Sequence, residues 1–142
     1  MSINSRMKGK QGELELAGVI FEQTGIRLHR NLIQTRSGGY DLLVGDDQEG
    51  PVADRLRQYA IECKRAKAAT PAYITKWWEQ ATRQASEAKK IPCLAYRADR
   101  HEWRIVIPMS LVNNDLPKTI DDINYTLNLS VVGFGSVLRE CG

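Results

Sequence analysis

The chain has 142 residues, of which 42% are hydrophobic and 26% are charged, a composition typical of one globular domain with a substantial core. Its net charge of +3 is too mild to indicate a nucleic-acid-binding protein by itself. No apolar run approaches the roughly 20 residues of a membrane span, and the N-terminus lacks the apolar segment of a signal peptide, so we expect no contact with a membrane.

The first predicted element is a helix from Met7 to about Thr24, after a loosely held lead-in over residues 1–6. Gly25 is expected to end this helix, because glycine readily adopts the left-handed conformation of a C-terminal cap. Glu13 falls in the first turns, where it either reaches over the end of the adjoining sheet or complements the helix dipole. Apolar positions at helical spacing predict the buried face, which comprises Leu14, Leu16, Ala17, Gly18, Ile20 and Phe21.

Two strands and a loop are predicted to follow this helix. Residues 26–32 alternate imperfectly between apolar and polar, as an edge strand does, and residues 37–44 form a second strand that contains Asp41. Residues 45–56 are rich in acidic residues, glycine and proline, and are predicted to form a loop or a hairpin tip.

The third predicted strand, over residues 58–66, suggests a chemistry. Glu62 and Lys64 alternate with apolar residues, so both project from the same face of the strand. If the Asp41 strand pairs with this one, two carboxylates meet and require a cation between them. Mg²⁺ is the preferred candidate and leaves Lys64 to act on a water or a phosphate. The alternative is a solvated face of an antiparallel sheet without chemistry.

A long helix is predicted from Thr70 to about Lys90, because a proline at the first helical position favours helix entry. Of the adjacent Trp77 and Trp78, we expect one in the core and the other available to stack on bases. Its predicted buried face comprises Ile74, Trp77, Trp78, Ala81, Ala85 and Ala88.

Strands are predicted at residues 91–96 and 103–107, followed by a helical turn near residues 111–115 and an apolar alternation over residues 125–138. Because a long helix connects two strands, we expect a crossover and a mixed α/β sheet. We expect a single domain over residues 1–142, in which residues 109–142 form a tail whose packing the pattern does not define.

With these elements placed, the chain resembles the PD-(D/E)xK nuclease superfamily, and within it the archaeal-type Holliday-junction resolvases. The resemblance covers roughly residues 6–108, and Tyr40 stands where the motif has its proline. The segments that carry it occur in the family's order, and they are residues 8–16, Tyr40-Asp41-Leu42, Ile61-Glu62-Cys63-Lys64 and residues 91–95.

The resemblance implies a restriction-endonuclease-like mixed central sheet flanked by helices, and a Mg²⁺-dependent DNA endonuclease with Mn²⁺ as a substitute ion. Asp41, Glu62 and the main-chain carbonyl of Cys63 would bind the metal. Glu13 would complete the acidic set, and Lys64 would activate the attacking water and steady the phosphate. Gln80 and Gln84 would support the site from the following helix. The residues expected to hold DNA phosphates are Lys8, Lys10, Arg36, Arg65 and Lys67.

Three functions remain open from the sequence. The most specific is a branched-DNA resolvase that works as a homodimer on four-way junctions, since two symmetric cuts need two sites. The second is a restriction-type or recombination nuclease acting on duplex or single-stranded DNA. The third is a DNA-binding module with a nuclease fold and no catalysis, against which the complete set of Glu13, Asp41, Glu62 and Lys64 argues.

The apolar tail and the cysteines bear on assembly and location. The apolar residues between Leu127 and Leu138 provide either a dimer interface or a further strand of the domain's own sheet. The three cysteines are widely spaced, which favours reduced thiols over disulfides or a zinc site. We therefore expect a cytoplasmic protein or, if phage-encoded, one that acts in the host cytoplasm.

Overall fold

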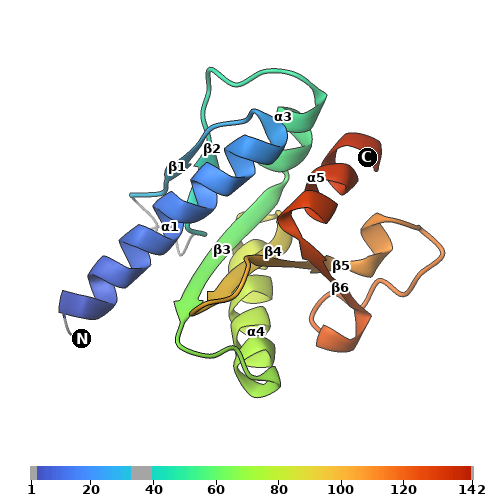
Figure 1. The fold of residues 1–142 in the computed structure, drawn as a ribbon. Helices are drawn as coiled ribbons and strands as arrows, with labels where there is room; N and C mark the ends of the chain where they lie inside the picture. The colour runs from blue at the N-terminus through green and yellow to red at the C-terminus, as the bar shows by residue number, and fades with distance from the viewer. Residues whose placement is uncertain (1–2, 33–39, 142) are drawn as a thin grey trace.

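The computed structural model describes residues 3–32 and 40–141, with the side chains described from Gly9 onward. Its centre is a six-stranded sheet in which the strands follow one another in the order β1-β2-β3-β4-β5-β6 (Figure 1). The strands are β1 (Leu28–Arg30), β2 (Leu42–Val44), β3 (Tyr59–Ala66), β4 (Ile91–Ala98), β5 (Arg104–Pro108) and β6 (Thr126–Ser130). The helices are α1 (Ile3–Thr24), α3 (Pro51–Arg57), α4 (Pro71–Ala88) and α5 (Val131–Glu140), with short 3₁₀ turns η1 (Met109–Leu111) and η2 (Ile123–Tyr125).

The predicted crossover is confirmed. Strands β3 and β4 pair in parallel, with α4 connecting them, whereas the other neighbouring strands pair antiparallel. Thr70 caps α4 by accepting a hydrogen bond from the backbone N–H of Tyr73 (3.2 Å), and Pro71 follows at the first helical position. The sheet is therefore mixed, and the fold belongs to the α/β class.

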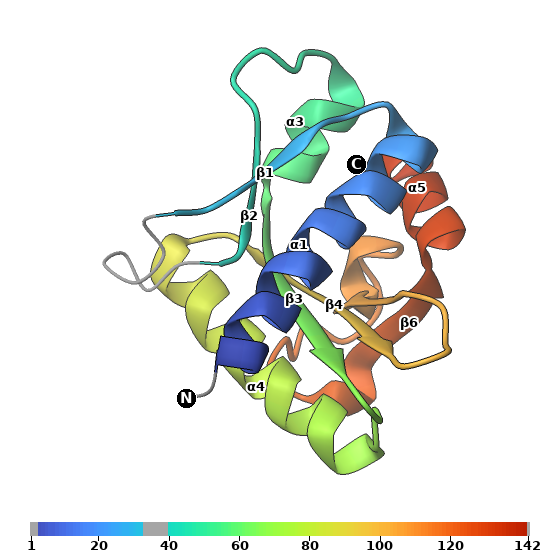
Figure 2. The ribbon, with the colours of Figure 1, turned by 60° about the vertical axis from the view of Figure 1, so that its left-hand side comes forward.

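Helices cover both faces of the sheet. Successive residues of a strand point to opposite faces, so β3 and β4 contribute to two separate cores. Leu16 and Ile20 of α1 pack with Ile61 and Ala95 on one face, together with α3 and α5. Trp78 of α4 packs with residues of β4 and β5 on the opposite face. Figure 2 shows α1 crossing in front of β3, with α5 lying beside α1. No helix in the described part of the chain is long and apolar enough to cross a membrane.

Helix α1 begins four residues earlier than predicted, and part of its predicted buried face is wrong. Leu14 and Phe21 are 54% and 41% exposed, while Leu16 and Ile20 are buried as expected. Apolar residues occur on several sides of this helix, so periodicity alone did not define the face that the sheet covers. Gly25 ends the helix as predicted, with φ at 73° and its N–H bonded to the carbonyl of Phe21 (2.8 Å).

The segment predicted as a loop over residues 45–56 contains helix α3, whose buried residues Ala53 and Leu56 join the α1-side core. Gly50 and Pro51, taken as loop signals, stand at its N-terminal cap and first position. The described part of the second predicted strand is also shorter, because β2 begins at Leu42, directly after Asp41.

The tail combines a strand and a helix. Strand β6 pairs antiparallel with β5, and α5 then packs on the α1 side of the sheet. Ser130 caps α5 by accepting a hydrogen bond from the N–H of Gly133 (3.0 Å), and Phe134 and Leu138, one helical turn apart, are buried. The alternation predicted over residues 125–138 therefore ends at Ser130. The tail's apolar residues mostly pack within the chain's own core, and Val132 remains 57% exposed.

Candidate active site

Asp41 lies where β2 begins, at the edge of β3. Its backbone N–H donates to the carbonyl of Ile61 (2.8 Å), and its carboxylate Oδ2 accepts a hydrogen bond from the backbone N–H of Cys63 (2.7 Å). Leu42 is the residue of β2 that pairs with β3, opposite Ile61. The Asp41 carboxylate therefore accepts the hydrogen bond that a backbone carbonyl of a neighbouring strand would otherwise accept from Cys63, and this bond holds it beside Glu62.

Glu62 and Lys64 project from the same face of β3, as the period-two pattern predicts, and α4 lies over that face. Lys64 Nζ lies 3.4 Å from Glu62 Oε1, and the side-chain amide of Gln80 donates to the same oxygen at 3.3 Å. Glu62 is only 3% exposed, and its second oxygen, Oε2, is buried without a hydrogen-bond partner. A buried carboxylate oxygen left unpaired is costly, which indicates that the site is built to receive a further group.

The two carboxyl groups influence each other strongly. Burial raises the pKa of Asp41, an effect that the Cys63 N–H opposes and the charge of Glu13 reinforces. Burial is also the main cause that raises the pKa of Glu62. Repulsion from Asp41 raises this pKa further, and the positive charge of Lys64 lowers it. At neutral pH the pair therefore retains a proton or requires a cation in its place.

Glu13 reaches the site from α1. Gly12 allows α1 to approach β3 closely, because an added Cβ there would lie 3.2 Å from Cβ of Arg65. Glu13 is 7% exposed and accepts a hydrogen bond from Arg30 Nε (3.0 Å), which gives it a charged partner from β1. Arg30 was not predicted as a site residue, since nothing in the sequence relates an edge-strand arginine to a glutamate 17 positions earlier.

A model of the protein family described as "Phage putative PDDEXK endonuclease" matches residues 4–133 of the chain. The chain belongs to this family. It is a nuclease of the PD-(D/E)xK type, which confirms the superfamily predicted from the sequence.

Two proteins with known names are similar to this chain. Protein D14 of Escherichia phage T5 is 28% identical over 130 residues, which cover 84% of this chain and 81% of the phage protein. The solved structure of Hjc, a Holliday junction resolvase from Archaeoglobus fulgidus, aligns with 95% of this chain and 90% of its own, with a TM-score of 0.43 and 17% sequence identity.

The acidic residues of this PDDEXK endonuclease suit a hard metal ion, although their number is small. Within residues 3–32 and 40–141, no group of three or more His, Cys, Asp or Glu side chains is arranged to hold a metal. Asp41 and Glu62 nevertheless provide two adjacent carboxyl groups, and the unpaired Oε2 of Glu62 offers a free lone pair. A Mg²⁺ ion accepts such oxygen donors and completes its shell with water. The donor set therefore fits this ion with few protein ligands.

The two glutamines predicted to support the site lie on one stripe of α4. Gln80 contacts Glu62 directly, as described above. The side-chain oxygen of Gln84 is buried without a hydrogen-bond partner. Since the pair is separated by one helical turn, both amides line the α4 side of the sheet.

The basic residues predicted to bind phosphates differ in their surroundings. Lys10 and Lys67 are exposed, on α1 and directly after β3. The side chain of Lys8 and the whole of Arg36 lie outside the described residues. Arg65 is engaged within the protein, where its guanidinium pairs with Asp99 and lies 3.8 Å from Glu15. Its charge is thus already balanced by two carboxylates.

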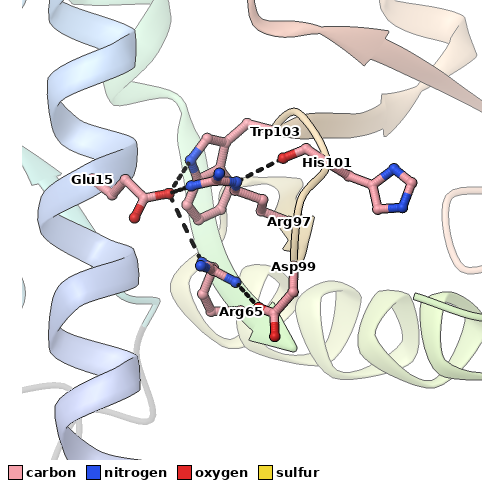
Figure 3. Close-up of polar contacts among 6 residues, drawn as sticks. All are labelled: Glu15, Arg65, Arg97, Asp99, His101 and Trp103. Atoms are coloured by element: carbon pink, nitrogen blue, oxygen red, sulfur yellow. Dashed lines mark hydrogen bonds and ion pairs between the residues drawn. The ribbon is translucent and has the colours of Figure 1, made fainter. Parts of the chain in front are cut away.

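Arg65 belongs to a polar cluster on the α1 side of the sheet, which we call the Glu15 cluster and which comprises Glu15, Arg65, Arg97, Asp99 and Trp103 (Figure 3). Oε1 of Glu15 accepts hydrogen bonds from Arg97 and from the indole N–H of Trp103 (3.0 Å). Arg97 also donates to the carbonyl of His101 (2.6 Å). The cluster therefore fastens α1 to β3, to β4 and to the turn that leads into β5.

Proposed function

We propose that this protein is a Mg²⁺-dependent endonuclease that hydrolyses phosphodiester bonds in DNA. The observation that carries the proposal is the Asp41–Glu62 pair, in which Glu62 is buried, its Oε2 has no hydrogen-bond partner, and Lys64 lies beside its Oε1. The raised pKa values of both carboxyl groups mean that their ionised forms are destabilised in the folded protein. A purely structural site would gain nothing from this cost. A site that receives a divalent cation accounts for this cost.

In this proposal Asp41, Glu62 and the main-chain carbonyl of Cys63 hold the ion, with Mn²⁺ as a substitute. The bound ion supplies a nucleophile at neutral pH and relieves the charge that develops on the phosphate. Asp41 is oriented for this role by the Cys63 N–H, and Glu62 by the amide of Gln80. Glu13, neutralised in part by Arg30, adds negative charge near Asp41.

Lys64 would act on the reacting phosphate. Its side chain is 25% exposed, so that its ammonium group is accessible from solvent while it also contacts Glu62. With the charge of Glu62 neutralised, the Lys64 ammonium would be available to donate to a phosphate oxygen or to orient the attacking water. During hydrolysis the water loses a proton as its oxygen bonds to phosphorus, and the departing oxygen gains one.

The finer proposal is that the substrate is branched DNA, including four-way junctions, and that two copies of the chain act together. One chain offers one Asp41–Glu62 site, whereas paired cuts across a two-fold symmetric junction need two sites. The tail gives this assembly little support, because Phe134 and Leu138 are buried in the chain's own core. Val132, at 57%, is the most exposed of the large apolar residues described in the tail, and an interface would be tested there.

The experiment is cleavage of end-labelled four-way junction, flap, duplex and single-stranded DNA, with Mg²⁺, with Mn²⁺ and with EDTA. We expect metal-dependent cuts that disappear in Asp41→Asn and persist in Asp46→Asn, which changes an exposed acid nearby. Paired cuts in junctions alone would support the resolvase, and cuts in duplex or single strands would favour the restriction or recombination type. Metal-independent binding without any cleavage would contradict the proposal and indicate a non-catalytic module.

Assembly is tested separately by light scattering with and without four-way DNA. Val132→Glu should yield folded monomers if the tail forms the interface, while Phe134→Glu should unfold the protein because Phe134 is only 1% exposed. A wild-type monomer that stays monomeric on the junction would exclude the paired-cut mechanism and leave a nuclease that cuts once.

A further inference from the structure

Three aromatic rings form a continuous row beside the candidate active site. The rings of Tyr73 and Trp77 are stacked, with centroids 5.9 Å apart and an interplanar angle of 14°. The ring of Trp77 also contacts that of Tyr96 on β4, at 5.9 Å and 44°. Trp78, in contrast, is fully buried in the core. The expectation that one of the two tryptophans lies in the core is confirmed for Trp78, and stacking of Trp77 on bases stays a prediction.

The row is firmly supported at its inner end and open at its outer end. Tyr96 is 7% exposed, and its hydroxyl accepts a hydrogen bond from the amide of Asn128 on β6 (2.8 Å). Trp77 is half-buried between the other two rings. Tyr73 is 52% exposed, although a tyrosine ring is large and its exposure to water is unfavourable. Tyr73 thus presents an exposed aromatic ring that is stacked on the half-buried ring of Trp77.

The row leads into the active site along one stripe of α4. Tyr73, Trp77, Gln80 and Gln84 are spaced four, three and four residues apart, which places them on one helix face. Gln80 is the residue that contacts Glu62. At about 1.5 Å of rise per residue, Tyr73 lies about 10 Å along the helix from Gln80. On the sheet below, Tyr96 pairs with Lys64.

Basic side chains line a cavity next to Tyr96, the inner ring of the row. A cavity of about 670 Å³ adjoins Tyr96, and its lining includes Lys67, His101, Arg104 and Glu102. Arg104 is held by two hydrogen bonds to Asn128, a neutral residue, so these contacts leave its positive charge uncompensated. Aromatic rings next to cations form the usual surface for unpaired nucleotides, because bases stack on rings while phosphates bind cations.

We propose that Tyr73 and Trp77 form a stacking platform for an unpaired base of the DNA next to the cleavage site, with Lys67 and Arg104 binding the adjoining phosphates. This inference rests on the proposed nuclease function and specifies its substrate. The DNA has single-stranded nucleotides beside the scissile phosphate, as at a branch, a flap or a frayed end. Fully paired DNA offers no base face to Tyr73 and is bound through its phosphates alone.

The test compares a blunt duplex with the same duplex carrying a single-stranded tail, using fluorescence anisotropy with Ca²⁺ in place of Mg²⁺ to limit cleavage. The wild-type protein should bind the tailed DNA about tenfold more tightly. Tyr73→Ala should remove this preference without changing duplex binding, and Tyr73→Phe should retain it. Phe21→Ala, which removes an exposed helical aromatic on the opposite side of the sheet, is the matched control and should retain it too.

A second readout places a fluorescent 2-aminopurine in the tail. Its emission should be quenched by wild-type protein and by Tyr73→Phe, but not by Tyr73→Ala. Equal loss of binding on both DNAs, or no effect of Tyr73→Ala on tailed DNA, would overturn the platform. If the wild-type protein nevertheless cuts DNA with Mg²⁺, the nuclease proposal survives that result. A protein that neither binds nor cuts either DNA would overturn both.

Discussion

Two polar clusters lie on opposite faces of the same parallel strand pair, and they are satisfied to very different degrees. On the α1 face, Glu15 receives hydrogen bonds from Arg97 and Trp103, and Arg65 pairs with Asp99 (Figure 3). On the α4 face, Glu62 and Asp41 adjoin each other, with Lys64 as the cation beside them and Oε2 of Glu62 unpaired. One strand, β3, supplies both clusters through alternate residues.

Under the proposed function, this difference separates a structural cluster from a catalytic one. In the Glu15 cluster, two guanidinium groups balance two carboxylates, so that each charged side chain has a partner of opposite charge within the protein. In the Asp41–Glu62 pair, the balance is incomplete, and the cost is expressed as raised carboxyl pKa values. Incomplete compensation is expected where a ligand must supply the missing charge.

The largest effect should come from removing a carboxylate of the incomplete cluster. Asp41→Asn and Glu62→Gln should each reduce DNA cleavage by at least about 10²-fold, because even residues that only orient metal ligands contribute up to that much. Both substitutions preserve the shape of the side chain and remove one of two mutually repelling carboxyl groups, so the folded state should persist in circular dichroism. Wild-type cleavage rates in the double variant would show that these carboxylates have no role in the reaction.

Lys64 should give the next largest effect. Lys64→Ala should lower kcat by about tenfold to 10²-fold while the Kd for DNA changes little, because in the proposed mechanism its ammonium acts on the reacting phosphate. Lys67→Ala, which removes an exposed cation after the same strand, should show the opposite pattern of weaker binding with nearly unchanged kcat. If Lys64→Ala changed Kd and kcat in parallel, Lys64 would be another phosphate contact.

The two clusters also differ in how far they could be predicted from the sequence. The alternation of Ile61, Glu62, Cys63 and Lys64 depends only on the local period of a strand, and the pairing with Asp41 needed one further assumption about neighbouring strands. The Glu15 cluster joins residues up to 88 positions apart, and no local pattern relates them. Arg65 was consequently predicted to face DNA, before its partners within the fold were apparent.

The errors in secondary structure have equally specific causes. Gly50 and Pro51 are common in loops, but the same residues also cap and begin a short helix such as α3. In the tail, apolar residues at every second position concealed the four-residue spacing of Phe134 and Leu138, and the helical start at Ser130 was not recognised. Both segments are fixed by packing onto the α1-side core, which sequence periodicity does not reveal.

A third prediction uses pH to distinguish the clusters. Asp41 and Glu62 have raised pKa values in the folded protein, so between their ordinary values of about 4 and these raised values the folded state binds more protons than the unfolded state. The metal-free protein should therefore be most stable at low pH within this window and lose this contribution as the pH rises. Saturating Mg²⁺ should restore stability at neutral pH, since under the proposed function it binds the folded state.

The measurement is the Tm across this pH range for the wild type and for Glu62→Gln, without metal and with Mg²⁺. Glu62→Gln should flatten the fall of Tm with pH and reduce the gain from Mg²⁺. Glu15→Gln should leave both features intact, because Glu15 belongs to the compensated cluster. Parallel curves for the wild type and Glu62→Gln would mean that burial of Glu62 has no energetic consequence.

The smallest effect should come from the compensated cluster itself. Glu15→Gln removes the charge that Arg97 and Arg65 share and weakens the acceptor for Trp103, yet Glu15 is 35% exposed, so water replaces part of what is lost. We expect a loss of about 1 kcal/mol in the free energy of unfolding, equivalent to a few degrees in Tm. The kcat of the folded protein should stay within about twofold of wild type, since no member of the cluster faces Glu62. Glu22→Gln, an exposed acid on the same helix, is the control and should change neither quantity. A large fall in kcat with unchanged Tm would reverse the comparison: the Glu15 cluster would then serve the reaction, by setting the distance between α1 and β3 and so the position of Glu13.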